Sequence, residues 1–361
     1  MKKLKFPKNL IGGRVIKTGV AVFITALVCQ LLNLPVAFAI VTAIVTIEPT
    51  AADSIRKGMQ RFPASLIGTA ISLTVIYIFG QSPLAYTLAA VLTIVACTKL
   101  KLEAGTLVAT LAAVAIVPTV EANYMIAFFE RAGTTTIALV ISTVVNVSIL
   151  PPKFSKIIAE RNLMLFGKVA TLISQIGVQL PSEQVYIKKA KKEYDQLTKE
   201  IEKSLQLCQF QLEEWKFHKH SIQDMRRFHF EQKKLQLLQQ ILYHLNSVFV
   251  TKINKYEMDG DKRLLLSQTL HVLSLGLNDS TYQINAEHVQ IIKKLDTKFW
   301  HIRSEVAEQG EDKRKYHHHF STEAVLYFAL LSIHDILEEL EHLRHHYQKF
   351  KPTHLEKETS T

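Results

Sequence analysis

The chain has 361 residues, of which 48% are hydrophobic and 21% charged, and its formal net charge is +11. This average hides two unlike halves that meet at Pro151-Pro152: the first holds twelve Lys and Arg against five Asp and Glu, whereas the second interleaves its bases and acids. Such mixing argues against a nucleic-acid-binding module, so we expect no nucleic-acid partner. The three cysteines show no C-x-x-C spacing, and neither a disulfide framework nor a zinc knuckle is indicated.

Four apolar stretches of the first half are long enough to cross a lipid bilayer. No charged residue occurs from 62 to 98, and a helix of that length would run ~55 Å, nearly twice the ~30 Å hydrocarbon core. Turn residues at Gly80-Gln81-Ser82-Pro83 divide this stretch into two helices. The spans expected on these grounds are 62–79, 83–98, 104–118 and 132–150.

The stretch 18–47 forms either one long kinked helix or two shorter helices separated at Asn33-Leu34-Pro35. With two helices, the basic residues of the N-terminus, of the 51–61 and 99–103 loops and of the segment after 152 all share one side of the membrane. The positive-inside rule then places both termini in the cytoplasm. A five-span chain would leave either the basic N-terminus or the large C-terminal half outside, so six spans are favoured.

After Pro152 the pattern changes to amphipathic helices, with apolar residues at four- and three-residue steps and no strand-like alternation of useful length. We therefore predict an all-α membrane protein, in which six transmembrane helices precede a cytoplasmic helical bundle or coiled-coil-like domain. The predicted parts are a six-span domain over 1–152, a cytoplasmic domain over 153–350 and a disordered tail over 351–361. The cytoplasmic helices are expected over 153–179, 183–219, 221–256, 262–307 (as one helix or as two that part near Gly276) and 318–350.

The sequence contains no motif that would bind a nucleotide or carry out a reaction. It lacks both G-x-x-x-x-G-K-[ST] and G-x-G-x-x-G, so transport driven by ATP hydrolysis within this chain is not expected. No nucleophile–base–acid arrangement is found, and we expect neither an enzyme nor a cofactor. His334, Glu338 and His342 share a helical face at a spacing that metal sites use, but a solvated helix end explains them better, and no metal site is predicted.

Polar residues near the cytoplasmic ends of the spans are the candidates for a substrate path. Glu48-Pro49 ends the second span, where transporters often place ion or substrate groups, and Thr42 and Thr46 lead to it at a four-residue step. The alternative for Glu48 is an ordinary interfacial acid. A basic rim at the cytoplasmic mouth would raise the local concentration of anions, unless its residues serve only to set topology. The rim would consist of Arg56, Lys57, Arg61, Lys99 and Lys101.

Small residues within the spans are expected to pack helices together. Ala64 and Gly68 on the third span, and Gly105 with Ala109 on the fifth, are such positions. A further stripe at four-residue steps marks the sixth span, where helix packing is favoured over lining a substrate path. That stripe consists of Thr134, Ala138, Ser142 and Asn146.

The run Ile47-Glu48-Pro49-Thr50, then Ser54-Ile55-Arg56-Lys57-Gly58, then Arg61 and Gly68-Thr69 resembles the signature of the aromatic acid exporter family, also called fusaric-acid-resistance-like. The resemblance covers roughly residues 10–150, and the helical remainder is similar to the C-terminal domain of Gram-positive members with a single membrane unit. It implies efflux of small organic anions, such as hydroxylated aromatic carboxylates, without ATP, from a bacterial cell membrane. The motif positions are Pro49, Arg56, Gly58, Arg61 and Gly68.

The resemblance also implies kinship with plant aluminium-activated malate channels, which have six spans and a helical cytoplasmic domain. Many relatives carry two six-span units in one chain, so a single unit would require a homodimer or a larger homo-oligomer in the bilayer. Three functions remain open: an exporter of organic anions, a passive anion channel, and a non-transporting membrane scaffold that recruits a cytoplasmic partner. The exporter is the leading hypothesis.

Overall fold

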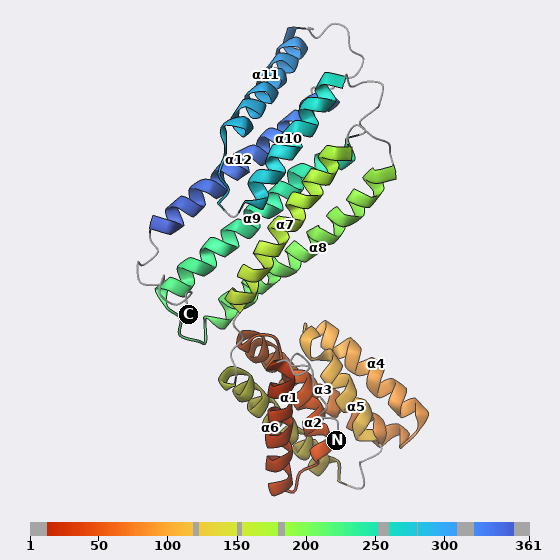
Figure 1. Cartoon of the computed structure of the whole chain (residues 1–361). Coiled ribbons are helices and arrows are strands. Elements are labelled where there is room, and N and C mark those ends of the chain that lie inside the picture. The colour runs from red at the N-terminus through yellow and green to blue at the C-terminus, as the bar shows by residue number, and fades with distance from the viewer. Residues whose placement is uncertain are drawn as a thin grey trace, which may run out of the picture. The chain divides into compact units, whose positions relative to one another are not determined.

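The computed structural model describes residues 13–117, 123–149, 154–179, 185–251, 260–279, 281–308 and 321–349. Within these ranges every regular element is a helix, and no strand is found. The chain divides into two compact units (Figure 1): the first contains Met1–Lys153 and Phe210–His220, and the second contains Phe154–Gln209 and Ser221–Thr361. The all-α fold expected from the sequence is confirmed for the described residues.

The described part of the first unit contains six α-helices, one short 3-10 helix and the end of α8 (Val185–Glu214). The stretch 18–47 forms two helices, because α1 ends at Leu31, Asn33 adopts a positive φ of 52°, and α2 begins after Pro35. The elements are α1 (Gly13–Leu31), α2 (Val36–Thr46), α3 (Ala51–Phe79), α4 (Pro83–Lys99), η1 (Glu103–Gly105), α5 (Thr106–Ile116) and α6 (Tyr124–Ser148).

The turn predicted in the long apolar stretch is confirmed. Helix α3 ends at Phe79, and Gly80 follows with a φ of 60°, a value that glycine adopts without steric cost. The Ser82 side chain then accepts a hydrogen bond from the Ala85 backbone N–H at 3.3 Å, and Pro83 opens α4. Both are typical signals for the start of a helix.

Helix α3 is the centre of the first unit, since α4, α5 and α6 all pack against it, while α1 and α2 pack against α6. Small residues allow the close approach. A side chain added at Gly68 would come within 2.7 Å of the Ala109 carbonyl oxygen on α5, and one at Gly105 within 2.5 Å of the Ala64 Cβ. At Gly58, in contrast, an added Cβ would meet nothing within 4 Å.

Three helices of the first unit, α1, α3 and α6, are long and apolar enough to cross a membrane. The remaining apolar helices are shorter, at Val36–Thr46, Pro83–Lys99 and Glu103–Ile116. An 11-residue helix such as α2 rises only ~16 Å, about half of the hydrocarbon core. By length and composition the structure therefore contains three candidate spans among the described residues.

The second unit is a bundle of long helices that lie side by side in Figure 1. Its helices are α7 (Phe154–Gln179), α8 (Val185–Glu214), α9 (Ile222–Val250), α10 (Gly260–Asn278), α11 (Ala286–Glu308) and α12 (Thr322–Lys349). The sequence located these helices well, and the stretch 262–307 does form two. The expected tail over 351–361 lies outside the described residues.

The predicted boundary near residue 153 misses one segment. Helix α8 ends at Glu214 instead of continuing to 219, and Phe210–His220 belongs to the first unit. Apolar periodicity is a local signal, and it does not reveal which unit a given helix end packs against.

Two glycine substitutions should have opposite effects. Gly68→Ala forces the α3 and α5 backbones apart and should lower stability by about 1–3 kcal/mol, the usual cost of overpacking. Gly58→Ala meets open space and should raise stability by up to about 1 kcal/mol, because alanine favours the helix. The measurement is the Tm of the purified full chain in detergent; a Gly68→Ala protein that melts with the wild type would contradict the packing described here.

Candidate functional site

The connection between α2 and α3 is the most polar part of the first unit. Thr50 ends this connection in an extended conformation, and its hydroxyl accepts a hydrogen bond from the Asp53 backbone N–H at 3.1 Å. This N-cap starts α3, and the Asp53 carboxylate in the first turn is favoured by the helix dipole. The cap thereby fixes the backbone position of Glu48, two residues before Thr50.

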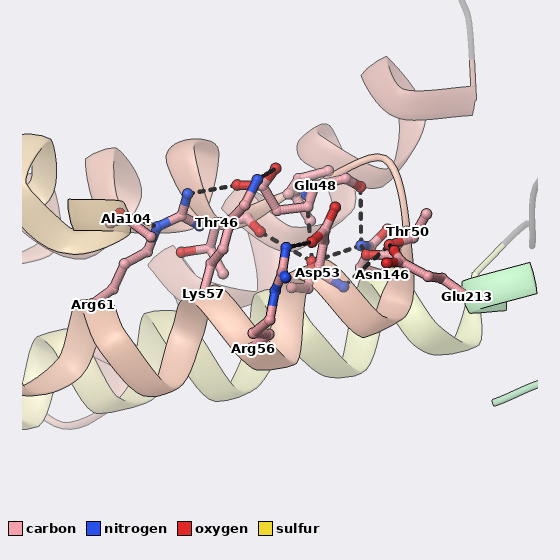
Figure 2. A network of polar contacts seen from close by, with 12 residues as sticks. Thr46, Glu48, Thr50, Asp53, Arg56, Lys57, Arg61, Ala104, Asn146 and Glu213 are labelled. Carbon is pink, nitrogen blue, oxygen red and sulfur yellow. Dashed lines mark hydrogen bonds and ion pairs between the residues drawn. The ribbon is translucent and has the colours of Figure 1, made fainter. Parts of the chain in front are cut away.

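Glu48 is held by two cations from α3 (Figure 2). Lys57 Nζ lies 2.9 Å from one carboxylate oxygen, and Arg61 Nη2 lies 2.5 Å from the other. Lys57 and Arg61 are four residues apart and therefore lie on the same helical face. The Glu48 and Arg61 side chains are 12% and 7% exposed, so this ion pair is largely shielded from the surroundings by protein.

Arg61 has hydrogen-bonding capacity that Glu48 does not use. Its Nε donates to the Ala104 carbonyl oxygen at 3.3 Å, which ties α3 to the connection that precedes α5. Its Nη1 is buried and has no hydrogen-bond partner among the described residues. A guanidinium has five N–H donors, and those on Nη1 of Arg61 remain available to another acceptor.

Asn146 of α6 holds the connection through its side-chain amide. The Nδ2 atom donates to the carbonyl oxygens of Glu48 and Thr50, at 3.1 and 3.2 Å, and to the Ser54 hydroxyl at 2.7 Å. The Oδ1 atom accepts from Lys17 Nζ of α1 at 2.9 Å. One fully buried amide thus joins α1, α6 and the start of α3, which gives buried backbone oxygens the partners they require.

Two glutamates from the end of α8 complete the network within the first unit. Thr50 Oγ1 donates to Glu213 at 3.1 Å, and the Ala51 backbone N–H donates to Glu214 at 2.7 Å. His218, just after α8, lies 3.0 Å from the Glu214 carboxylate and 2.9 Å from the Val147 carbonyl oxygen. The Glu214 carboxylate at the Ala51 N–H satisfies one of the donors that a helix start leaves open.

The pKa of Glu48 results from opposing influences. Burial by itself would raise the pKa of this carboxyl, but hydrogen bonds and charge from Lys57 and Arg61 outweigh it and lower the pKa below its ordinary value of 4.5. Glu48 is therefore ionised at neutral pH, and the cluster contains two cations around one anion.

The structure brings only part of the expected basic rim to this carboxylate. Arg56 is turned outward, with its side chain 68% exposed, and pairs with Asp53 at 2.6 Å. Lys99 and Lys101 are exposed and make no ion pair with any described residue. Three cations of the rim thus form ion pairs with Glu48 or Asp53, whereas Lys99 and Lys101 are exposed to solvent.

Thr42 and Thr46 are buried on α2, but their hydroxyls donate to backbone oxygens of their own helix, at 2.9 Å to Phe38 and 2.7 Å to Thr42 respectively. Such bonds satisfy a threonine inside a helix without a ligand. Pro49 is half-buried between Glu48 and the N-cap. Among these three residues, none has a free polar group that points into the Glu48 cluster.

Several residues of the site were missed by sequence reasoning. In the sequence Lys17 is one of several basic residues near the N-terminus and Asn146 belongs to a stripe that predicts helix packing, yet both are buried in the network. The available signal was a lysine or an amide inside or beside an apolar run. Such a side chain is costly to bury in a span unless it has a partner, so its presence indicates a polar contact. No local pattern in the sequence indicates that Glu213 and Glu214 of α8 contact the start of α3.

Arg131 of α6 is a second buried arginine, and it is paired differently. It is 6% exposed, its Nε and Nη1 have no hydrogen-bond partner among the described residues, and its guanidinium carbon lies 4.4 Å from the centroid of the Phe38 ring. A cation–π contact contributes up to about 2 kcal/mol, whereas burying an ion costs several kcal/mol. Phe38 alone does not offset the burial of this charge.

Comparison with known proteins places the chain in a family. Residues 9–149 match the family described as aromatic acid exporter family member 1. A UPF0421 protein of Bacillus cereus (strain ATCC 10987 / NRS 248) is 43% identical over 340 residues, which cover 94% of this chain and 95% of the relative. The chain belongs to the aromatic acid exporter family. The resemblance read from the sequence is confirmed, and this family is one of membrane exporters, not of enzymes.

Other relatives of this aromatic acid exporter family chain also carry the UPF0421 name. The UPF0421 protein of Halalkalibacterium halodurans is 33% identical over 334 residues, covering 92% of this chain and 89% of the relative. That of Staphylococcus epidermidis is 43% identical over 216 residues, covering 60% of this chain and 66% of the relative. The similarity to the first of these extends through both units.

No group of three or more His, Cys, Asp or Glu side chains in the described part of this exporter-family chain is arranged to hold a metal ion. His334 and Glu338 do approach each other at 3.3 Å, and His334 also lies 3.0 Å from His288.

Glu48→Gln should destabilise this exporter-family chain more than Asp53→Asn. Removing the Glu48 carboxylate leaves the buried Arg61 unpaired and should lower the free energy of unfolding by about 3 kcal/mol. This is the lower end of the range for a broken buried pair, because the second cation, Lys57, reaches solvent. The Asp53–Arg56 pair is exposed on one side and should contribute less than about 1 kcal/mol. Chemical or thermal unfolding of both purified variants measures the difference; equal losses would show that burial does not distinguish the two pairs.

The contribution of Glu48 to stability should depend on pH. Because its folded pKa lies below the ordinary 4.5, the contribution is fully present above about pH 4.5 and is lost as the pH falls through the lowered folded value. The Tm difference between wild type and Glu48→Gln should therefore be constant from pH 7 to 5 and shrink below pH 4.5. A difference that grows on acidification would have the wrong sign.

Proposed function

We propose that this chain is an ATP-independent exporter of small organic anions, of the aromatic carboxylate kind, in the bacterial cell membrane. Membership of the aromatic acid exporter family supports this assignment. The absence of both nucleotide-binding patterns from the sequence supports independence from ATP. The observation that carries the proposal is the buried cluster in which Lys57 and Arg61 share the single carboxylate of Glu48.

The proposed topology has six spans, with both termini and the domain over 153–350 in the cytoplasm. Helices α1, α3 and α6 are candidate spans, and α2, α4 and η1 with α5 supply the three shorter apolar helices. Helix α3 has 29 residues and would rise ~43 Å, more than the hydrocarbon core needs. Its excess is the charged first part of the helix, from Ala51 to Arg61, which would lie at the cytoplasmic interface as the positive-inside rule requires.

In the proposed mechanism the substrate carboxylate replaces Glu48. Arg61 and Lys57 are arranged around a carboxylate at 2.5 and 2.9 Å, and a guanidinium recognises planar carboxylates through charge-assisted hydrogen bonds. An incoming anion competes with Glu48 for these donors, and the free Nη1 of Arg61 is an additional one. Lys99 and Lys101 are exposed on the connection beside Arg61 and would attract the anion.

The proposed assembly is a homodimer or a larger homo-oligomer. The chain provides a single unit of membrane helices, whereas the resemblance implies a pathway made by two. The partner surface would come from a second copy of the same unit in the bilayer.

Efflux from proteoliposomes tests the function. Vesicles containing the full chain are preloaded with 4-hydroxybenzoate or other organic anions, and release is followed with and without an imposed pH gradient. Gradient-dependent release of one anion class would establish a coupled exporter, and gradient-independent release with large unitary currents would favour a channel. Absence of release together with a stoichiometric protein partner in a pull-down would favour a scaffold.

Arg61→Gln should reduce 4-hydroxybenzoate efflux at least about tenfold, because a charge-assisted hydrogen bond contributes ~1.5–3 kcal/mol. The matched control is Arg14→Gln, which removes the same charge from an exposed arginine whose side chain, among the described residues, bonds the Ile47 carbonyl oxygen alone, at 3.2 Å. The control should stay within about twofold of the wild type. Unchanged efflux of Arg61→Gln at equal reconstitution would refute the role of Arg61.

A further inference from the structure

The register between α3 and α6 locates Arg131 along the polar face that these helices share. The Asn146 amide contacts the Ser54 hydroxyl at 2.7 Å, and the Ser65 and Thr135 hydroxyls lie 3.4 Å apart. The residue numbers rise on one helix as they fall on the other by the same step, so one antiparallel register holds between the two contacts. Continuing it by one turn puts Arg131 about 22 Å along α3 from the Ser54 level.

Hydroxyl groups, not carboxylates, surround this level. By the same register Arg131 faces Thr69, and Ser65, Thr69 and Ser72 are fully buried on α3. Thr69 and Ser72 donate to backbone oxygens, of Ser65 at 2.8 Å and of Ala113 at 2.6 Å. No described Asp or Glu forms an ion pair with Arg131, including Glu130 beside it in sequence. The Nε and Nη1 donors of the guanidinium therefore have no acceptor among the described residues.

We propose that Arg131 binds the carboxylate of an organic anion at a site separate from the Glu48 cluster, between α2, α3 and α6. The inference rests on the function proposed above and adds the residue that would hold the substrate deeper in the first unit. A guanidinium matches a planar carboxylate, and Arg is the residue best suited to such pairing away from water. Two arginines, Arg61 and Arg131, then lie at successive levels of one polar face.

The Phe38 ring determines what kind of anion fits. It covers one face of the Arg131 guanidinium, so a carboxylate reaches the nitrogen atoms from the edge of the plane, with the remainder of the ligand beside an aromatic ring. A flat apolar group suits that position, because aromatic rings pack favourably against each other in offset or edge-to-face geometry. Arg131 itself is 6% exposed, and Phe38 belongs to α2, a short helix that begins after Pro35 and is followed by Pro49.

The test uses the purified full chain in detergent and two probes that differ only in charge: 4-hydroxybenzoate and its neutral amide, 4-hydroxybenzamide. Calorimetry gives the affinity for each. The wild type should prefer the carboxylate, and Arg131→Gln should weaken carboxylate binding about 10- to 100-fold without changing amide binding. Arg131→Lys should retain part of the preference, and the control Arg14→Gln should retain all of it.

Stability provides a second readout that a structural role would not give. Removing a buried, unpaired charge relieves its desolvation, so ligand-free Arg131→Gln should melt at or above the wild-type temperature and lose the rise in Tm that 4-hydroxybenzoate causes. A lower Tm with unchanged carboxylate preference would overturn the inference. So would displacement of the probe by equimolar phosphatidylglycerol or by chloride, which would assign the guanidinium to a lipid headgroup or to any small anion.

Efflux from proteoliposomes separates this inference from the proposed function. Wild-type efflux of 4-hydroxybenzoate together with an Arg131→Gln protein of unchanged carboxylate preference would leave the function standing and reject the site. Arg131-dependent binding without any efflux would support the site and reject the exporter. A wild-type chain that neither binds nor releases the probe would reject both.

Discussion

The first unit depends on one buried amide. The connection between α2 and α3 exposes backbone carbonyl oxygens to the protein interior, and the Asn146 side chain supplies the hydrogen bonds they need while Lys17 supplies the one that the amide oxygen needs. Because those partners come from α1 and α6, the start of α3 is fixed relative to both. The direction of the Glu48 carboxylate, and hence its pairing with Arg61, follows from that constraint (Figure 2).

The two buried arginines of the first unit differ in the groups that contact their positive charge. Arg61 has a carboxylate, a backbone oxygen and one unused nitrogen, whereas Arg131 has an aromatic face and no described anion. In a medium of low dielectric constant an uncompensated charge is costly, and the anion that we propose to bind Arg131 would remove that cost. The hydroxyl groups of Ser65, Thr69 and Ser72 on α3 are fully buried near Arg131, and those of Thr69 and Ser72 already donate to backbone oxygens of α3 and α5.

The sequence located most of the helices of both units and the turn at Gly80, because apolar periodicity and turn residues act over a few positions. The loop expected over 51–61 is wrong, since these residues form the first part of α3; their charges interrupt the apolar pattern but not the helix. It also singled out Glu48 and Arg61. Which cations pair with Glu48 could not be read, since that depends on the rotation of α3 and on the path of the connection before it. Lys17 was indistinguishable from a residue that sets topology, and the glutamates at the end of α8 act through a fold-level contact that has no counterpart in local pattern.

Asn146 binds the connection through the backbone oxygens of Glu48 and Thr50, not through the side chain of Glu48. These bonds hold the loop backbone without involving the side chain at position 48. In a programme of directed evolution, substitution of residue 48 by an amide or hydroxyl side chain would keep these backbone bonds to Asn146, but it would leave the buried Arg61 without its carboxylate. The atoms that place the loop are thus different from the atoms that the loop presents to Arg61 and Lys57.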